Sequence, residues 1–208
     1  MAQPAAAAAL FAPSLAADPR RVPGWPCRSW GIVKIARYSP QWPIAFEKER
    51  ARIVLALGRV AVRIDHHGST AVPGLDAKPI IDIQISVRDL RHPASYALSL
   101  ATLGYRHVPH ADDARCPFFH RPASWPHTHH VHVVEAGGIE ERETLAFRDY
   151  LRANPEAAVA YATLKRSLSP LLVRGADGRE EYARRKTTFI AGALKAAIEA
   201  GFPRDCPE

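Results

Sequence analysis

The pattern of hydrophobic and polar positions predicts regular secondary structure from about residue 32 onward. Alternating or densely β-branched stretches predict strands, and apolar residues at helical spacing predict helices. Strands are expected at residues 32–38, 60–64, 79–87, 105–108, 118–121 and 129–135, and helices at residues 39–58, 94–103, 140–154, 156–172 and 180–199. Strands in the first part of the chain and helices in the last part favour an α+β domain around a mixed sheet.

Local signals mark several of the helix ends. Ser39 followed by Pro40 is typical of a helix start, and Gly58 is typical of a helix end. Three glutamates at residues 140–143 crowd the start of a later helix, where carboxylates suit the helix dipole. That helix should end before Pro155, because the residue before a proline disfavours helical geometry.

The first 28 residues differ in composition from the rest of the chain. The first 20 contain nine alanines, and five prolines fall between Pro4 and Pro26. Because proline excludes regular helix and sheet, we expect a tail at residues 1–28, one domain at 29–200 and a short tail at 201–208. A signal peptide is the competing interpretation of the mildly apolar residues 5–17, but no Lys or Arg precedes them.

Composition restricts the class of protein. The chain has 208 residues, of which 47% are hydrophobic and 24% charged, values typical of a soluble globular domain and incompatible with wholesale disorder. No apolar run reaches the roughly 18–20 residues that a membrane helix needs. The three cysteines are widely spaced and form no CxxC pair, which favours neither a zinc site nor a disulfide framework. A reducing, cytoplasmic location is therefore the simplest expectation.

The charge balance favours an anionic partner. Lys and Arg number 28 against 21 Asp and Glu, a net charge of +7. Such a charge suits a nucleotide, a phosphorylated metabolite or nucleic acid, without choosing among them. Nucleic acid is the least favoured of these, because the basic residues are spread along the chain and no dense basic run interleaved with aromatic residues is present.

The most informative stretch is HHGSTAVPGLDAKPIIDI, at residues 66–83. A predicted strand leads into Gly68–Thr70, where glycine lets a phosphate approach the backbone and the Ser69 and Thr70 hydroxyls can donate to its oxygens. Asp82 follows inside an apolar strand, where a lone carboxylate is costly to bury unless it binds something positive. Metal-dependent phosphoryl or nucleotidyl transfer needs such a carboxylate to hold Mg²⁺ against phosphates.

Structural interpretations compete with this one. Gly-Ser-Thr could be an ordinary turn, and Asp82 could form an ion pair with Lys78 or Arg88. In the functional interpretation, the Lys78 ammonium at the mouth of the Asp82 strand reaches a phosphate. The other basic candidates for substrate binding, each with a solvated surface charge as the alternative, are Arg121, Lys165 and Lys186.

Histidines form a second candidate group. His130 and His132 lie on one face of the strand at residues 129–135, because side chains alternate along a strand. Two such imidazoles could bind a transition metal, contact phosphate or transfer a proton. The alternative is that both line a polar face of the sheet. His127 and His129 are assigned to the loop and the strand edge.

Together these stretches resemble the GrpB family. The pattern Gly-Ser-Thr-x-Val-Pro-Gly, three residues, then Lys-Pro-Ile-Ile-Asp-Ile resembles the family's signature. The resemblance extends over about residues 32–198 and includes residues 38–42, 130–133, 145–152, 161–165 and 182–189. It implies a nucleotidyltransferase-like fold, with a mixed sheet, flanking helices and a helical C-terminal part. The same domain also occurs fused behind dephospho-CoA kinase.

The resemblance leaves the activity open. The superfold usually carries a second acid two residues after the first, and Gln84 stands there, which weakens a two-metal interpretation. One hypothesis is an enzyme that transfers a nucleotidyl group from a nucleoside triphosphate, with Asp82 and His132 catalytic and Mg²⁺ or Mn²⁺ held by Asp82, His130 and His132. The alternative is a non-catalytic module that binds a nucleotide or a CoA-like phosphate ligand. A hydrolase or phosphodiesterase that uses a transition metal is a third, weaker hypothesis.

Overall fold

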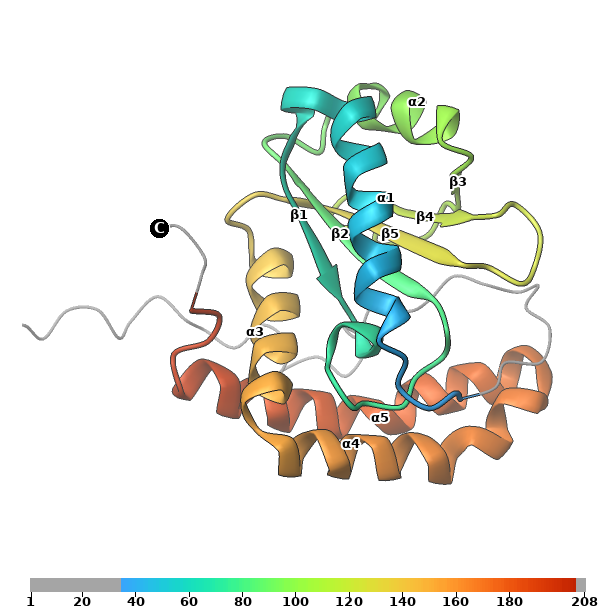
Figure 1. Ribbon diagram of the computed structural model, residues 1–208, viewed down its shortest axis with the longest axis vertical. Helices are drawn as coiled ribbons and strands as arrows, with labels where there is room; N and C mark the ends of the chain where they lie inside the picture. Colours follow the sequence, from blue (N-terminus) through green and yellow to red (C-terminus); the bar gives the residue numbers. More distant parts are fainter. Residues whose placement is uncertain (1–34, 205–208) are drawn as a thin grey trace, which may run out of the picture.

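The computed structural model describes residues 35–204, which form a five-stranded mixed sheet packed between helices (Figure 1). The strand order is β1-β2-β5-β4-β3, and only β2 and β5 pair in parallel. The strands are β1 (Ala61–His67), β2 (Ile81–Val87), β3 (Arg106–His107), β4 (Phe118–Arg121) and β5 (His129–Glu135). The α+β class with a mixed sheet is confirmed.

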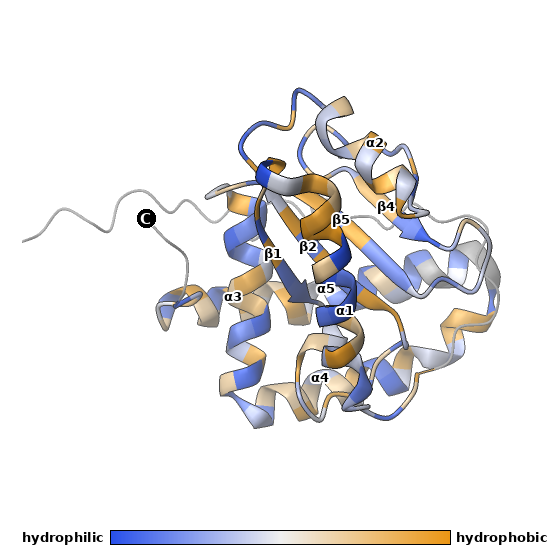
Figure 2. Cartoon of the chain, turned by 45° about the horizontal axis from the view of Figure 1, so that its top comes forward, coloured by the Kyte–Doolittle hydropathy of each residue, from blue (hydrophilic) through white to orange (hydrophobic). Residues whose placement is uncertain are grey.

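Helices cover the sheet from two directions. They are α1 (Gln41–Leu57), α2 (Ala94–Thr102), α3 (Ile139–Ala153), α4 (Pro155–Leu168) and α5 (Gly175–Glu199). Three short 3-10 turns accompany them: η2 (Gly58–Val60), η3 (Ser69–Ala71) and η4 (Ser169–Val173). In Figure 1, α1 crosses the sheet, while α4 and α5 run across its lower end. Figure 2 shows hydrophilic and hydrophobic segments side by side along α3 and α4, as expected of helices with one buried face.

Alternation along β2 separates the core from a polar face. Ile83 and Ile85 belong to the main hydrophobic cluster with α1 and α2. Asp82 and Gln84 point to the opposite face, since successive side chains of a strand alternate. In the neighbouring strand β5, Val131 and Val133 join the core in the same way, and His130 and His132 align with these polar residues of β2. The predicted placement of Asp82 and Gln84, and of His130 and His132, on the strand face opposite the core residues is confirmed.

Some predicted boundaries were wrong. The described part of the predicted strand at 32–38 makes only an isolated bridge, between Ala36 and Ala77. The predicted helix at 156–172 ends at Leu168 and continues as η4, because Pro170 cannot donate the next helical hydrogen bond. Helix α5 begins five residues before the predicted start at 180, in a stretch without periodic apolar residues.

The predicted terminal tails are only partly covered by the structure. Residues 1–28 and 205–208 lie outside the described residues. Phe202, inside the predicted C-terminal tail, packs against a small cluster formed by Ala146, Leu194 and Ala197. Within residues 35–204, no helix combines the length and the apolar character that crossing a membrane requires.

Candidate functional site

Asp82 lies near the start of β2, directly against the turn at Gly68. Gly68 has a φ of +67°, and a Cβ at this position would collide with Asp82 Oδ2. A side chain at residue 68 is therefore excluded by the backbone conformation and by the carboxylate together. The Asp82 side chain is 15% exposed, and its Oδ1 accepts no hydrogen bond from the described residues. One carboxylate oxygen thus lies against the turn, and the other is a buried acceptor that receives no hydrogen bond from the described residues.

Two lysines meet over one tyrosine ring beside this carboxylate. Lys78 comes from the loop before β2, and Lys186 comes from α5. Their Nζ atoms lie 5.2 and 4.6 Å from the centroid of the Tyr182 ring. An aromatic face attracts ammonium groups, so Tyr182 holds both charges in the same region. Both lysines act electrostatically on Asp82.

Helix α4 contributes a third lysine and contacts the loop between β1 and β2. Lys165 Nζ donates a 2.6 Å hydrogen bond to the Asp76 carbonyl and lies 4.7 Å from the centroid of the Tyr161 ring. The Tyr161 side chain is hydrogen-bonded to Ser69 at the other end of the loop. Arg166 Nη2 pairs with the Asp76 carboxylate at 2.6 Å. Lys78, Lys165 and Lys186 are called the lysine cluster below.

Burial and mutual repulsion make the charges of this region costly. The pKa values of Lys165 and Lys186 are lowered to about 7, first by desolvation and then by repulsion from a neighbouring lysine. Desolvation raises the pKa of Asp82 to about 6, against the opposing effects of His132 and the lysine cluster. Strongly perturbed groups that converge in this way are characteristic of functional sites. Three ammonium groups against one carboxylate favour a bound anion.

Three histidines surround Asp82 on the same face of the sheet. His67 of β1 and His130 of β5 stand opposite Asp82 in the strand register, and His132 follows two residues after His130. His130 Nδ1 is 3.3 Å from Asp82 Oδ1, and the His67 and His132 rings have centroids 5.0 Å apart. Burial lowers the pKa of His132 to about 4 and the pKa values of His67 and His130 well below 6.5. All three imidazoles are therefore neutral at pH 7.

The expected metal ligands can be compared with this geometry. Asp82 and His130 are close together, whereas His132 stands opposite Gln84. Within residues 35–204, no group of three or more His, Cys, Asp or Glu side chains is arranged to hold a metal ion. Mg²⁺ is commonly held by one or two carboxylates together with substrate phosphates, and Asp82 alone fits that type of site. The metal roles of His130 and His132 stay predictions.

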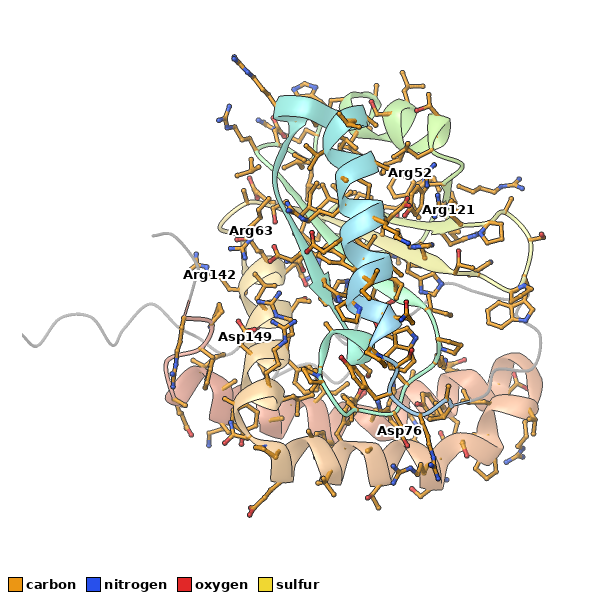
Figure 3. The ribbon with its side chains drawn as sticks, in the orientation of Figure 1. Arg52, Arg63, Asp76, Arg121, Arg142 and Asp149 are labelled. Atoms are coloured by element: carbon orange, nitrogen blue, oxygen red, sulfur yellow. The ribbon has the colours of Figure 1, made fainter. Side chains whose placement is uncertain are left out.

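Two residues expected to bind substrate make structural contacts elsewhere. Arg121 Nη2 pairs with Glu49 Oε2 of α1 at 3.0 Å. In Figure 3, Arg121 lies beside α1, well apart from Asp76 in the loop that α4 contacts. Thr70 is buried, and its hydroxyl donates to the Ile80 carbonyl at 3.2 Å. These contacts engage the polar groups of both side chains, and the substrate-binding roles of Arg121 and Thr70 stay predictions.

Sequence reasoning missed three residues that line this site. Two of them are tyrosines of the helices: Tyr161 precedes Lys165 by four residues, and Tyr182 precedes Lys186 by four residues. This spacing puts each tyrosine and its lysine on one helix face and was a usable signal. The third, His67, stands opposite the β2 carboxylate only because β1 and β2 pair in one particular register, which the sequence pattern did not reveal.

The fold and the site define a small α+β protein with a partly buried carboxylate and a lysine cluster on one sheet face. A family model described as GrpB protein matches residues 32–196. The chain belongs to the GrpB family, as its sequence motifs suggested.

Individual relatives agree with this assignment. The UPF0157 protein BH1888 of Halalkalibacterium halodurans is 37% identical over 166 residues, which cover 79% of this chain and 82% of that protein. The crystal structure of the conserved protein GrpB from Enterococcus faecalis is similar with a TM-score of 0.71 and 30% identity, over 80% of this chain and 98% of that one.

Some relatives are considerably longer than the matched region. The dephospho-CoA kinase of Mycolicibacterium paratuberculosis is 34% identical over 190 residues, which cover 79% of this chain and 46% of that protein. The UPF0157 protein YqkA of Bacillus subtilis is 34% identical over 165 residues, which cover 79% of this chain and 47% of that protein. This chain therefore spans about half the length of these two relatives.

Proposed function

We propose that this protein binds a phosphorylated small molecule, such as a nucleoside triphosphate or a CoA-like ligand, at the lysine cluster. The convergence of Lys78, Lys165 and Lys186 beside Asp82 is the observation that carries the proposal. Ammonium groups that burial has made costly to charge gain most from a bound anion, because charges interact more strongly where water is excluded.

The residues around the cluster suit this role. The Asp82 carboxylate fills the space beside Gly68, so the donor on this turn is the Ser69 hydroxyl, which would exchange its hydrogen bond to Tyr161 for one to a phosphate oxygen. Tyr161 and Tyr182 hold the ammonium groups through their rings, so the cations are placed before a ligand arrives. The similarity to a protein named dephospho-CoA kinase adds support, since that name denotes chemistry on a phosphorylated molecule.

Metal-dependent nucleotidyl transfer is the second candidate, and the Asp82 carboxylate favours it. Its Oδ1 accepts no hydrogen bond from the described residues, and it lies beside the lysines that would bind the phosphates. Asp82 would hold Mg²⁺ together with phosphate oxygens, and the ion would neutralise charge developing on the phosphate. Gln84 supplies no second carboxylate, which restricts the protein to a single-metal site. The lysines would bind and orient the phosphates for an acceptor of unknown chemistry.

Isothermal titration calorimetry with ATP, GTP, CTP, UTP and CoA, with and without Mg²⁺, tests the binding proposal. We expect binding by the wild type and a roughly 10- to 100-fold loss for Lys186→Met, since a hydrogen bond to a charged group contributes about 1.5–3 kcal/mol. Lys48→Met is the matched control, because Lys48 is an exposed lysine of α1 and its loss changes the net charge equally. If none of these ligands binds the wild type, the proposal is wrong.

Asp82→Asn separates the two candidates. Removing a carboxylate beside the phosphates should strengthen metal-free binding, because like charges repel. Under the transfer hypothesis the same variant should lose any increase in affinity that Mg²⁺ gives the wild type. If Mg²⁺ leaves the affinity of the wild type unchanged, nucleotidyl transfer through Asp82 is refuted and phosphate binding stands.

A further inference from the structure

A line of buried side chains leads from Asp82 to the loop between β4 and β5. His130 Nδ1 is 3.3 Å from Asp82 Oδ1, and His130 Nε2 is 3.3 Å from His127 Nδ1. The exposed fractions of His130 and His127 are only 1% and 6%. Both ring nitrogens of His130 therefore face a polar atom inside the protein.

The far end of this line is fixed in place. The His127 ring stacks on the His120 ring, with centroids 3.8 Å apart and planes within 14°. His120 Nδ1 donates to the Pro122 carbonyl at 2.9 Å, and this hydrogen bond fixes the His120 ring of the stacked pair. Trp125 contacts His127 edge-on at 5.3 Å. His127 thus has little freedom to turn away from His130.

One arrangement of protons satisfies both contacts. An ionised carboxylate only accepts hydrogen bonds, so the His130 nitrogen that faces Asp82 must carry the proton. His130 Nε2 is then an acceptor, and His127 Nδ1 must donate to it, because the bond at one ring nitrogen sets the tautomer of the other. Burial lowers the pKa of His127 to about 4 and holds the pKa of His130 well below its usual value, so each ring carries a single proton at pH 7.5.

We propose that His130 and His127 are positioning residues for Asp82, with His130 directing Nδ1–H at the carboxylate and His127 holding His130 in that tautomer. The His130–Asp82 contact is close but not aligned as a full hydrogen bond, since Oδ1 accepts none. Such contacts are commonly long or misaligned in ligand-free sites and tighten on binding. The assignment rests on the proposed function, in which Asp82 faces the ligand. It gives His130 a role other than metal ligation, because its Nδ1 faces the Asp82 carboxylate and its Nε2 contacts His127 Nδ1.

The tautomers can be measured directly by NMR of the full chain labelled with 15N at histidine, at pH 7.5. We expect His130 and His127 both to be protonated at Nδ1 in the wild type. In Asp82→Ala, both should shift toward mixed tautomers, although His127 does not touch residue 82. His92→Asn, at an exposed histidine outside this line, is the control that should leave both signals in place. An Nε2-protonated His130 in the wild type, or a His127 signal unmoved by Asp82→Ala, would overturn the proposal.

A conservative variant distinguishes positioning from mere packing. His130→Asn keeps an amide donor near the Nδ1 position, whereas His130→Leu fills the space without a donor. We expect the Asp82 carboxylate 13C signal, identified by its loss in Asp82→Ala, to stay near the wild-type position in the Asn variant and to move in the Leu variant. Equal signals in the two variants would contradict the inference. No ligand is needed, so a calorimetric failure to bind phosphate compounds refutes the proposed function separately.

Discussion

Replacing Lys186 by methionine should stabilise the fold while weakening phosphate binding. Lys186 is a partly buried ammonium beside Lys78, and no carboxylate fully compensates its charge. Methionine is similar in length and keeps apolar contact with Tyr182, but it has no charge to desolvate. The proposed function predicts opposite signs for the two effects, because the charge that destabilises the unliganded fold would be the one that binds the phosphate.

The magnitude follows from the pKa of Lys186, which falls from 10.5 to about 7 on folding. One pKa unit is worth about 1.4 kcal/mol, so the cost of the charged form at pH 6 is at most about 5 kcal/mol. Partial exposure and relaxation of the neighbouring lysines reduce this cost. We expect Lys186→Met to raise the free energy of unfolding by about 1–3 kcal/mol at pH 6.

The pH dependence gives a second check. Between pH 7 and 10.5 the unfolded wild type binds more protons at Lys186 than the folded state does, so its stability rises with pH in this window. The gain in the free energy of unfolding from Lys186→Met should therefore be complete below pH 7 and disappear near pH 10.5. Urea unfolding followed by circular dichroism at pH 6, 8 and 10, with Lys48→Met as control, measures it. A variant less stable than the wild type at pH 6, or an undiminished gain at pH 10, would refute the reasoning.

Three further predictions concern the Gly68 turn, Arg121 and the lysine cluster. Gly68→Ala should cost about 2–4 kcal/mol in urea unfolding, whereas Gly74→Ala, with a φ of +77° but open space around it, should cost only about 1 kcal/mol. Arg121→Met should cost about 1.5–3 kcal/mol, the contribution of a hydrogen bond to a charged group, because Glu49 keeps its ion pair with Arg52 and its hydrogen bond from Tyr105. Its ATP affinity in calorimetry should stay within about twofold of the wild type, and a larger loss would show that Arg121 takes part in binding. Tripolyphosphate affinity should fall from pH 6 to 9 as the two helix lysines deprotonate near pH 7, and a flat profile would contradict this.

Much of the fold was predictable because the relevant signals are local. Alternation in β2 and β5 divided each strand correctly, since one face must be apolar to pack against helices. The predicted element boundaries were wrong where the sequence carries no such signal. Residues 35–38 are extended without pairing beyond Ala36, and the first turn of α5 carries no periodic apolar residue to reveal it.

The sequence by itself also identified the two residues around which the proposed site is arranged. Gly68 and Asp82 were recognisable because each is unusual in its local setting, a glycine at a strand end and a carboxylate among isoleucines. The structure adds the reason for their combination, since the carboxylate occupies the space that a side chain at residue 68 would need.

Only the tertiary structure decided which of the cations come together. Lys78, Lys165 and Lys186 lie far apart in the sequence, and each looked no different from a solvated surface lysine, as did Arg121. The packing of α4 and α5 against the loop before β2 brings the three lysines together, while Glu49 on α1 holds Arg121 elsewhere. Periodicity reveals which face of an element is buried, but the partners that meet there depend on how distant elements pack.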